Sequence, residues 1–202
     1  MYSKKAKKTA LIVVDMLKCL TVEGGYNYYP TAKEMIEDGY DDKIRQMRDH
    51  GCLVVWVGSA LQHRSGYTAT PHEINPELAG RSLAGEQDEA SNEFDDRLWI
   101  DEARDVIVRK HTYSAFWGTP LLSILQQNGV QNVLVCGIKT NVCCRQTLVD
   151  SVSHGFRTYL IKDMTSTNNE EIKAYHLEEI NRYFAKVLDA DEAVTRFRNG
   201  EF

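Results

Sequence analysis

The sequence predicts an α/β protein with a three-layer, doubly wound architecture, in which helices cover both faces of a largely parallel six-stranded sheet. Three observations lead to this prediction. Short apolar runs recur along the chain, they are nearly continuous rather than alternating, and helix-length segments separate most of them. Continuous apolar runs are typical of strands that are buried on both faces, as in parallel sheets. Strands that alternate with helices form βαβ units, which build such a sheet.

The predicted strands are five apolar runs rich in Val, Ile and Leu, with a weaker sixth near the end of the chain. They are TALIVVDM (9–16), CLVVWVGS (52–59), DVIVRKH (105–111), NVLVCGI (132–138), RTYLIKD (157–163) and the weaker KVLDA (186–190). Their length and their content of β-branched residues favour strands over helices.

Helix start and stop signals frame four of the segments between these runs. The predicted helical segments span residues 31–51, 120–129, 140–155 and 170–185. A glycine ends each of the first three, and Pro120 opens the second, which are the positions that these residues favour at helix ends. Thr140 and Asn141 are candidate caps at the start of the third.

Residues 60–104 interrupt the alternation, because they hold no clear strand and contain several Gly, Pro and polar clusters. A segment of this length inside a compact domain is usually a functional excursion. The length of the chain suits one large core. We therefore predict a single domain over residues 1–202, with a loop or lid excursion at about 60–104.

Composition excludes several classes of function. The formal net charge is −5 and the basic residues are scattered, so no surface suits a nucleic-acid backbone. No apolar stretch approaches the ~18 residues of a membrane span, and no signal peptide is visible. The five cysteines are odd in number and irregularly spaced, which argues against a disulfide framework. We expect a reduced, cytoplasmic protein with a small-molecule substrate and no nucleic-acid or membrane partner.

Chemically active residues follow three of the predicted strands. Asp15 closes the first run, Lys110 closes the third, and Cys143 lies shortly after the fourth. Ligands bind beyond the carboxyl ends of the strands in an open parallel sheet. An acid, a base and a thiol are therefore expected to meet at one edge of the sheet.

These three groups suit nucleophilic catalysis. Cys143 lies in the first turn of a predicted helix, where unpaired N–H groups and the helix dipole favour a thiolate. Lys110 favours the thiolate further, and Asp15 is placed to accept the thiol proton and return it to a leaving group. The exposed N–H groups suit an oxyanion. The set predicts hydrolysis of an amide through a thioester, although each residue taken singly is more often a cap, a solvated charge or a packing residue.

The same residues resemble the isochorismatase-like cysteine hydrolases, which include nicotinamidases, N-carbamoylsarcosine amidases and ureidoacrylate amidohydrolases. The motifs that carry the resemblance are ALIVVDM, KHTYSAFWGTPL and VCGIKTNVCC, and it extends through RTYLIKDMTST and HLEEINRYFAKV over nearly the whole chain. It implies a catalytic triad of Asp15, Lys110 and Cys143. The family pattern Gly-x-x-Thr-Asn/Asp-x before the thiol selects Cys143 and leaves Cys144 as a packing residue.

The resemblance also implies a non-proline cis peptide bond between Ile138 and Lys139. In the family this bond turns the N–H of the residue at position 139, together with that of Cys143, toward the oxyanion. Most relatives have a small residue at this position, so Lys139 is a departure, and its side chain faces either the pocket or a subunit contact.

The branch of the family follows from what is present and what is missing. Nicotinamidases carry an Asp-x-His motif after the second strand to bind a metal, and this chain has VGSALQHR there. His63 and His72 are interpreted as surface histidines, so we predict no metal and no cofactor. The chain is most similar to the ureidoacrylate, biuret and N-carbamoylsarcosine branch. The usual Gln-Asn-Asp-Phe after Asp15-Met16 is replaced by LKCL, which leaves contacts from that loop open.

Four further residues are candidates for substrate binding. Phe116 and Trp117 follow the lysine motif, Tyr26 lies in the aromatic patch GGYNYYP, and Arg145 follows the thiol by two positions. The alternatives are core aromatic residues, a tyrosine-rich subunit interface, and a solvent-facing or helix-packing arginine. We expect a homo-oligomer, either a dimer or a tetramer.

The predicted function is cleavage of a C–N bond in a small ureido, carbamoyl or other linear amide by a cysteine-dependent amidohydrolase. Two alternatives are a catalytically silent member that binds or assembles, and an isochorismatase-type hydrolase of a vinyl ether. The sequence gives little support to a redox role for Cys143 and Cys144. Adjacent side chains on a helix diverge by about 100°, and this divergence rarely allows the geometry of a disulfide.

Overall fold

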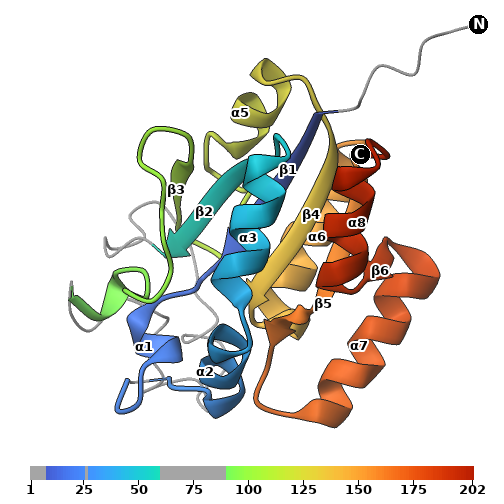
Figure 1. Cartoon of the computed structure of the whole chain (residues 1–202). Coiled ribbons are helices and arrows are strands. Elements are labelled where there is room, and N and C mark those ends of the chain that lie inside the picture. The colour runs from blue at the N-terminus through green and yellow to red at the C-terminus, as the bar shows by residue number, and fades with distance from the viewer. Residues whose placement is uncertain (1–7, 26, 60–89) are drawn as a thin grey trace, which may run out of the picture.

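A computed structural model describes residues 8–25, 27–59 and 90–202, which form a parallel six-stranded sheet with helices on both faces (Figure 1). The strand order is β3-β2-β1-β4-β5-β6, and each neighbouring pair is parallel. The chain therefore winds outward from β1 in one direction and from β4 in the other. The predicted fold class is confirmed.

The strands are β1 (Lys8–Val14), β2 (Leu53–Ser59), β3 (Val106–Lys110), β4 (Val130–Ile138), β5 (Arg157–Ser166) and β6 (Lys186–Leu188). The α-helices are α1 (Lys18–Thr21), α2 (Pro30–Glu37), α3 (Tyr40–Asp49), α5 (Leu121–Gln127), α6 (Arg145–Ser153), α7 (Glu170–Tyr183) and α8 (Ala190–Arg198). A 3₁₀ turn, η2 (Ala90–Asn92), and a π-helix, η3 (Thr140–Cys144), complete these elements. Each of the six predicted runs overlaps one of these strands.

Three helical features differ from the predictions. The segment predicted as one helix over 31–51 is divided into α2 and α3 at Gly39, whose φ of 90° suits glycine because it has no Cβ. The helix predicted from 140 begins as a π-helix whose N-cap is Lys139, without a side-chain cap. Asn141 is not a cap, because its Oδ1 accepts a hydrogen bond from Thr167 at 2.9 Å. Helix α8 has no counterpart among the predicted helices.

Two apolar layers hold the sheet between the helices. Successive side chains of a strand point to opposite faces, so Leu11 and Val13 of β1 enter one layer and Ile12 and Val14 enter the other. Helices α1, α2, α3 and α8 cover the first layer, and α5, α6 and α7 cover the second (Figure 1). Each large side chain buried in this way contributes about 1.5–3 kcal/mol relative to an exposed one.

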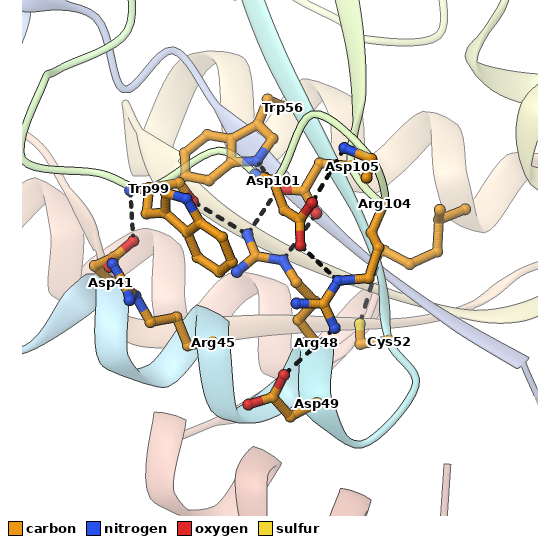
Figure 2. Close-up of polar contacts among 12 residues, drawn as sticks. Asp41, Arg45, Arg48, Asp49, Cys52, Trp56, Trp99, Asp101, Arg104 and Asp105 are labelled. Atoms are coloured by element: carbon orange, nitrogen blue, oxygen red, sulfur yellow. Dashed lines mark hydrogen bonds and ion pairs between the residues drawn. The ribbon is translucent and has the colours of Figure 1, made fainter.

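A buried ion pair fixes the segment that leads into β3. Arg48 of α3 donates from Nε and Nη2 to the two carboxylate oxygens of Asp105 at 2.8 and 2.6 Å (Figure 2). Trp56 of β2 donates from Nε1 to the same carboxylate at 2.8 Å. The ring of Trp99 packs against the Arg48 guanidinium, 4.9 Å from its centroid. The segment is thereby held against both α3 and β2.

The same segment also holds the residues that follow β1. Thr21 Oγ1 donates to Oδ2 of Asp95 at 2.6 Å, and the N–H of Asp95 donates to the Met16 carbonyl at 3.0 Å. Leu17 and Phe94 form an antiparallel bridge beside these bonds. The loop after β1 is therefore fixed against residues 94–95. Most of the predicted excursion, residues 60–89, lies outside the described residues.

None of the helices in the described part of the chain has both the length and the apolar character that a membrane span requires.

Candidate active site

The ends of three strands bring Asp15, Lys110 and Cys143 together at the carboxyl edge of the sheet. Nζ of Lys110 lies 2.8 Å from Oδ2 of Asp15 and 3.6 Å from Sγ of Cys143. It also donates to the carbonyl of Thr112 at 3.1 Å. An ammonium has three N–H donors, so each of them has an acceptor in this arrangement. The convergence expected from the strand ends is present.

The charges of Asp15 and Lys110 are almost fully removed from water, since each side chain is 3% exposed. Burial acts to lower the pKa of Lys110, but the attractions of Asp15 and then of Cys143 outweigh it and raise that pKa above its ordinary value. Lys110 is therefore a fixed positive charge, and it is neutralised by the carboxylate beside it.

The Cys143 thiol keeps its proton in this environment. Burial raises the pKa of Cys143 to about 12, against the opposing effect of Lys110 and with a further increase from Asp15. The sequence analysis predicted a lowered pKa for Cys143. That prediction relied on the charge of Lys110 and on the start of a helix, because the extent of burial cannot be read from the sequence. A base is needed to remove the proton, and the Asp15 carboxylate is adjacent. Cys143 as a whole residue is partly buried, whereas Cys144 beside it is fully buried.

Two backbone conformations place Asp15. Asp15 itself has a φ of 49°, a left-handed conformation that costs a non-glycine residue roughly 1–2 kcal/mol. Its N–H donates to the carbonyl of Val57 in β2 at 2.8 Å. Gly137 has a φ of 109°, and a Cβ at that position would lie 2.0 Å from the carbonyl oxygen of Val14. Only glycine allows β4 to pass this close to the residue before Asp15.

The peptide bond between Ile138 and Lys139 is cis, as the resemblance implies. The Lys139 carbonyl accepts hydrogen bonds from the N–H groups of Val142 and Cys144, both at 3.1 Å, and so supports the turn that carries the thiol. The Lys139 ammonium lies 5.3 Å from the centroid of the Tyr29 ring. Its side chain is thus directed toward the start of α2 in its own chain.

The predicted aromatic contacts fall in three different places. Phe116 is buried in the second apolar layer, and its ring packs against those of His154 and Phe156 at centroid distances of 5.1 and 6.2 Å. It therefore matches the alternative of a core aromatic residue. Trp117 is 57% exposed. Tyr26 lies outside the described residues.

Arg145 forms an ion pair with a glutamate of the neighbouring helix α7. Its Nε and Nη2 donate to the two carboxylate oxygens of Glu179 in α7 at 3.0 and 2.9 Å. Its guanidinium also lies 5.5 Å from the centroid of the Phe184 ring. This geometry joins α6 to α7, which is the helix-packing alternative for Arg145.

Cys144 differs from its neighbour in its burial and in the partner of its sulfur. It is fully buried, its Sγ donates to the carbonyl of Cys136 at 3.6 Å, and burial raises the pKa of its thiol well above the ordinary value. Both thiols are free. Cys144 is a packing residue, as predicted.

Sequence reasoning missed Ser59, the last residue of β2. Its hydroxyl donates to Oδ1 of Asp15 at 3.4 Å, whereas the 2.8 Å contact of Lys110 is with Oδ2. The only signal in the sequence was its place at the end of a predicted strand.

Metal ligands are not gathered in the described part of the chain, where no group of three or more His, Cys, Asp or Glu side chains lies together. His63 and His72, predicted to be surface histidines, lie outside the described residues. The absence of a metal thus stays a prediction.

Comparisons with known proteins agree with this architecture. The family model of the isochorismatase domain matches residues 9–192. Ureidoacrylate amidohydrolase RutB of Klebsiella pneumoniae subsp. pneumoniae is 31% identical over 178 residues, which cover 79% of this chain and 73% of that protein. A probable inactive nicotinamidase of Arabidopsis thaliana is 28% identical over 187 residues, which cover 91% and 93% of the two chains.

A solved structure shares both fold and sequence. N-carbamoylsarcosine amidase from Thermoplasma acidophilum has a TM-score of 0.73 and 26% identity, with 91% of this chain and 97% of that chain covered. Together with the family match over residues 9–192, the parallel sheet and the cluster at its carboxyl edge establish the lineage. The chain belongs to the isochorismatase domain family.

Proposed function

We propose that this protein is a cysteine-dependent amidohydrolase that cleaves a C–N bond of a small ureido, carbamoyl or other linear amide through a thioester intermediate. The observation that carries the proposal is the position of the Lys110 ammonium, which contacts both the Asp15 carboxylate and the Cys143 sulfur. The names of two relatives, a ureidoacrylate amidohydrolase and an N-carbamoylsarcosine amidase, support hydrolysis of an amide and this class of substrate.

The first step is transfer of the thiol proton from Cys143 to Asp15. The resting site holds a carboxylate, an ammonium and a neutral thiol, and the transfer gives a carboxylic acid, an ammonium and a thiolate. The net charge is unchanged. Because Lys110 contacts both groups, the negative charge remains beside the ammonium before and after the transfer. This proximity offsets the cost of ionising a buried sulfur.

The thiolate then attacks the carbonyl carbon of the amide. A C–S bond forms, the carbonyl oxygen becomes an oxyanion, and the backbone N–H groups of Lys139 and Cys143 are its proposed donors. As the C–N bond breaks, Asp15 returns the proton to the leaving nitrogen. Water next attacks the thioester while Asp15 takes one of its protons. The C–S bond breaks, and Asp15 gives that proton back to the sulfur.

Ammonia release from a panel of small amides tests this function. The panel contains ureidoacrylate, biuret, N-carbamoylsarcosine, nicotinamide and maleamate, and the variants are Cys143→Ala and, as the matched control, Cys144→Ala. Turnover of a ureido compound that is lost in Cys143→Ala and kept in Cys144→Ala is the expected result. Turnover that survives the loss of Cys143 would refute the thiol mechanism.

A second candidate is a catalytically silent member that binds small molecules, which the likeness to a probable inactive nicotinamidase favours. Mass spectrometry of the wild-type protein after incubation with the panel separates the two. An acyl adduct on Cys143, or turnover, supports the enzyme. Neither an adduct nor turnover, with a panel compound raising the melting temperature, supports the silent binding protein.

A further inference from the structure

We propose that Ser59 is a positioning residue for the general base Asp15, and that Asn92 holds Ser59 in place. The proposal rests on the proposed function, because it assigns to Asp15 the transfer of the thiol proton. Ser59 makes and breaks no covalent bond in it and keeps its own proton. Its hydroxyl fixes the orientation of the carboxylate through both proton transfers.

The two oxygens of Asp15 have different donors. Lys110 donates to Oδ2 at 2.8 Å, and Ser59 Oγ donates to Oδ1 at 3.4 Å. Rotation of the carboxylate would therefore break both contacts. The Ser59 contact is longer than the 2.5–3.0 Å of an ordinary O–H···O bond, and catalytic contacts of this kind tighten when substrate binds.

The backbone brings Ser59 to this position. Residues Val14 and Val57 pair in the parallel register of β1 and β2, and the N–H of Asp15 donates to the Val57 carbonyl at 2.8 Å. Ser59 lies two residues further along β2, so its side chain points to the same face of the strand as that of Val57. The hydrogen bond from Asp15 thus fixes the end of β1 against the end of β2.

Asn92 acts from the segment that leads into β3. Its Nδ2 donates to the carbonyl of Ser59 at 2.7 Å, and its own carbonyl accepts from Nη1 of Arg109 at 3.3 Å. Asn92 is 4% exposed, and among the residues that the structure describes its buried Oδ1 has no hydrogen-bond partner. Its amide nitrogen holds the last carbonyl of β2, directly beside the hydroxyl that contacts Asp15.

Steady-state kinetics of Ser59→Ala, Ser59→Thr and Asn92→Ala test the proposal, with melting temperatures to confirm folding. We expect Ser59→Ala to lower kcat about tenfold with KM unchanged, the loss typical of one hydrogen bond to a charged group. Ser59→Thr keeps the hydroxyl and should restore most of kcat. Asn92→Ala should lower kcat less, and adding it to Ser59→Ala should cause no further loss, because it acts through Ser59.

The proposal is overturned if folded Ser59→Ala has the kcat of the wild type, or if Ser59→Thr is as impaired as Ser59→Ala. It is also overturned if Asn92→Ala lowers kcat equally in the presence and absence of the Ser59 hydroxyl.

A second measurement separates this proposal from the proposed function. Alkylation of Cys143 by iodoacetamide at pH 7 requires loss of the thiol proton but no amide substrate, and Cys143→Ala identifies the labelled site by mass spectrometry. If the wild type turns over no amide while Ser59→Ala still slows alkylation, the positioning role stands and the substrate class is wrong. If the wild type turns over an amide and Ser59→Ala changes neither rate, the function stands and the positioning role is wrong.

Discussion

Nζ of Lys110 lies 2.8 Å from Oδ2 of Asp15, and both side chains are 3% exposed. Desolvation of two charges offsets much of their attraction, so a buried pair of this kind is weak evidence for stability. Its geometry suits a different purpose. The pair keeps a permanent positive charge 3.6 Å from the Cys143 sulfur, where the proposed mechanism forms an anion.

Lys110→Met should therefore remove activity and also destabilise the fold. The substitution leaves the Asp15 carboxylate buried without its partner, which costs about 3–5 kcal/mol. The double variant Lys110→Met/Asp15→Asn holds no buried charge, so it should recover much of this loss while remaining inactive. Urea unfolding measures the stability of both variants, and ammonia release measures their activity. A double variant no more stable than Lys110→Met would contradict the argument.

The buried thiols predict a loss of stability at alkaline pH. In the folded protein burial raises the pKa of Cys136 to about 12, whereas an unfolded thiol loses its proton at about 8.5. Between these values the folded state binds more protons, so the free energy of unfolding falls as pH rises, by up to about 1.4 kcal/mol per pH unit for each such group. Below about pH 8 this contribution is constant.

Urea unfolding between pH 7 and 10.5 checks this slope. Cys136→Ala removes one titrating thiol away from the candidate active site, so its stability should fall less steeply with pH than that of the wild type. Parallel curves for the two proteins would show that Cys136 keeps no raised pKa in the folded state.

The fold and the three proposed catalytic residues followed from one physical regularity. Strands buried on both faces give continuous apolar runs, and parallel strands end at a common edge, so Asp15, Lys110 and Cys143 were expected together. The division at Gly39 was marked in the sequence, since glycine stops helices elsewhere in this chain. Helix α8 was hidden by its small apolar residues, although Ala190, with Ala193, Val194 and Phe197, follows a helical period.

The remaining features depend on contacts that no local pattern contains. Arg145 and Glu179 are brought together by the packing of α6 against α7. Ser59 has no distinguishing mark in the sequence until β1 and β2 pair in register. The raised pKa of Cys143 depends on burial, which outweighs a lysine that the sequence did reveal.

Gly137→Ala should be far more damaging than the same change at another glycine of positive φ. A Cβ at position 137 would lie 2.0 Å from the Val14 carbonyl oxygen, so the end of β1 must move, and Asp15 with it. We expect a loss of at least about 2 kcal/mol in stability, together with loss of activity. Urea unfolding and ammonia release measure the two effects.

Gly155→Ala is the matched control. Gly155 has a φ of 85°, and apart from its two chain neighbours no described residue would lie within 4 Å of a Cβ added there. Only the cost of the left-handed conformation, about 1–2 kcal/mol, therefore applies. The Gly155→Ala variant should release ammonia at the rate of the wild type. Equal activity in folded Gly137→Ala and Gly155→Ala would show that the approach of β4 to Val14 does not place the base.

Arg145 and Glu179 offer a test of whether the arginine binds substrate or only joins two helices. The side chains are 28% and 24% exposed, so their ion pair should contribute no more than about 1 kcal/mol. If the pair only packs α6 against α7, Arg145→Gln and Glu179→Gln should lower the free energy of unfolding by similar small amounts and leave KM unchanged. A substrate carboxylate held by Arg145 would instead raise KM in Arg145→Gln alone. Measuring KM for an anionic and a neutral substrate of the panel in both variants decides between them, because only a direct contact distinguishes the two substrates.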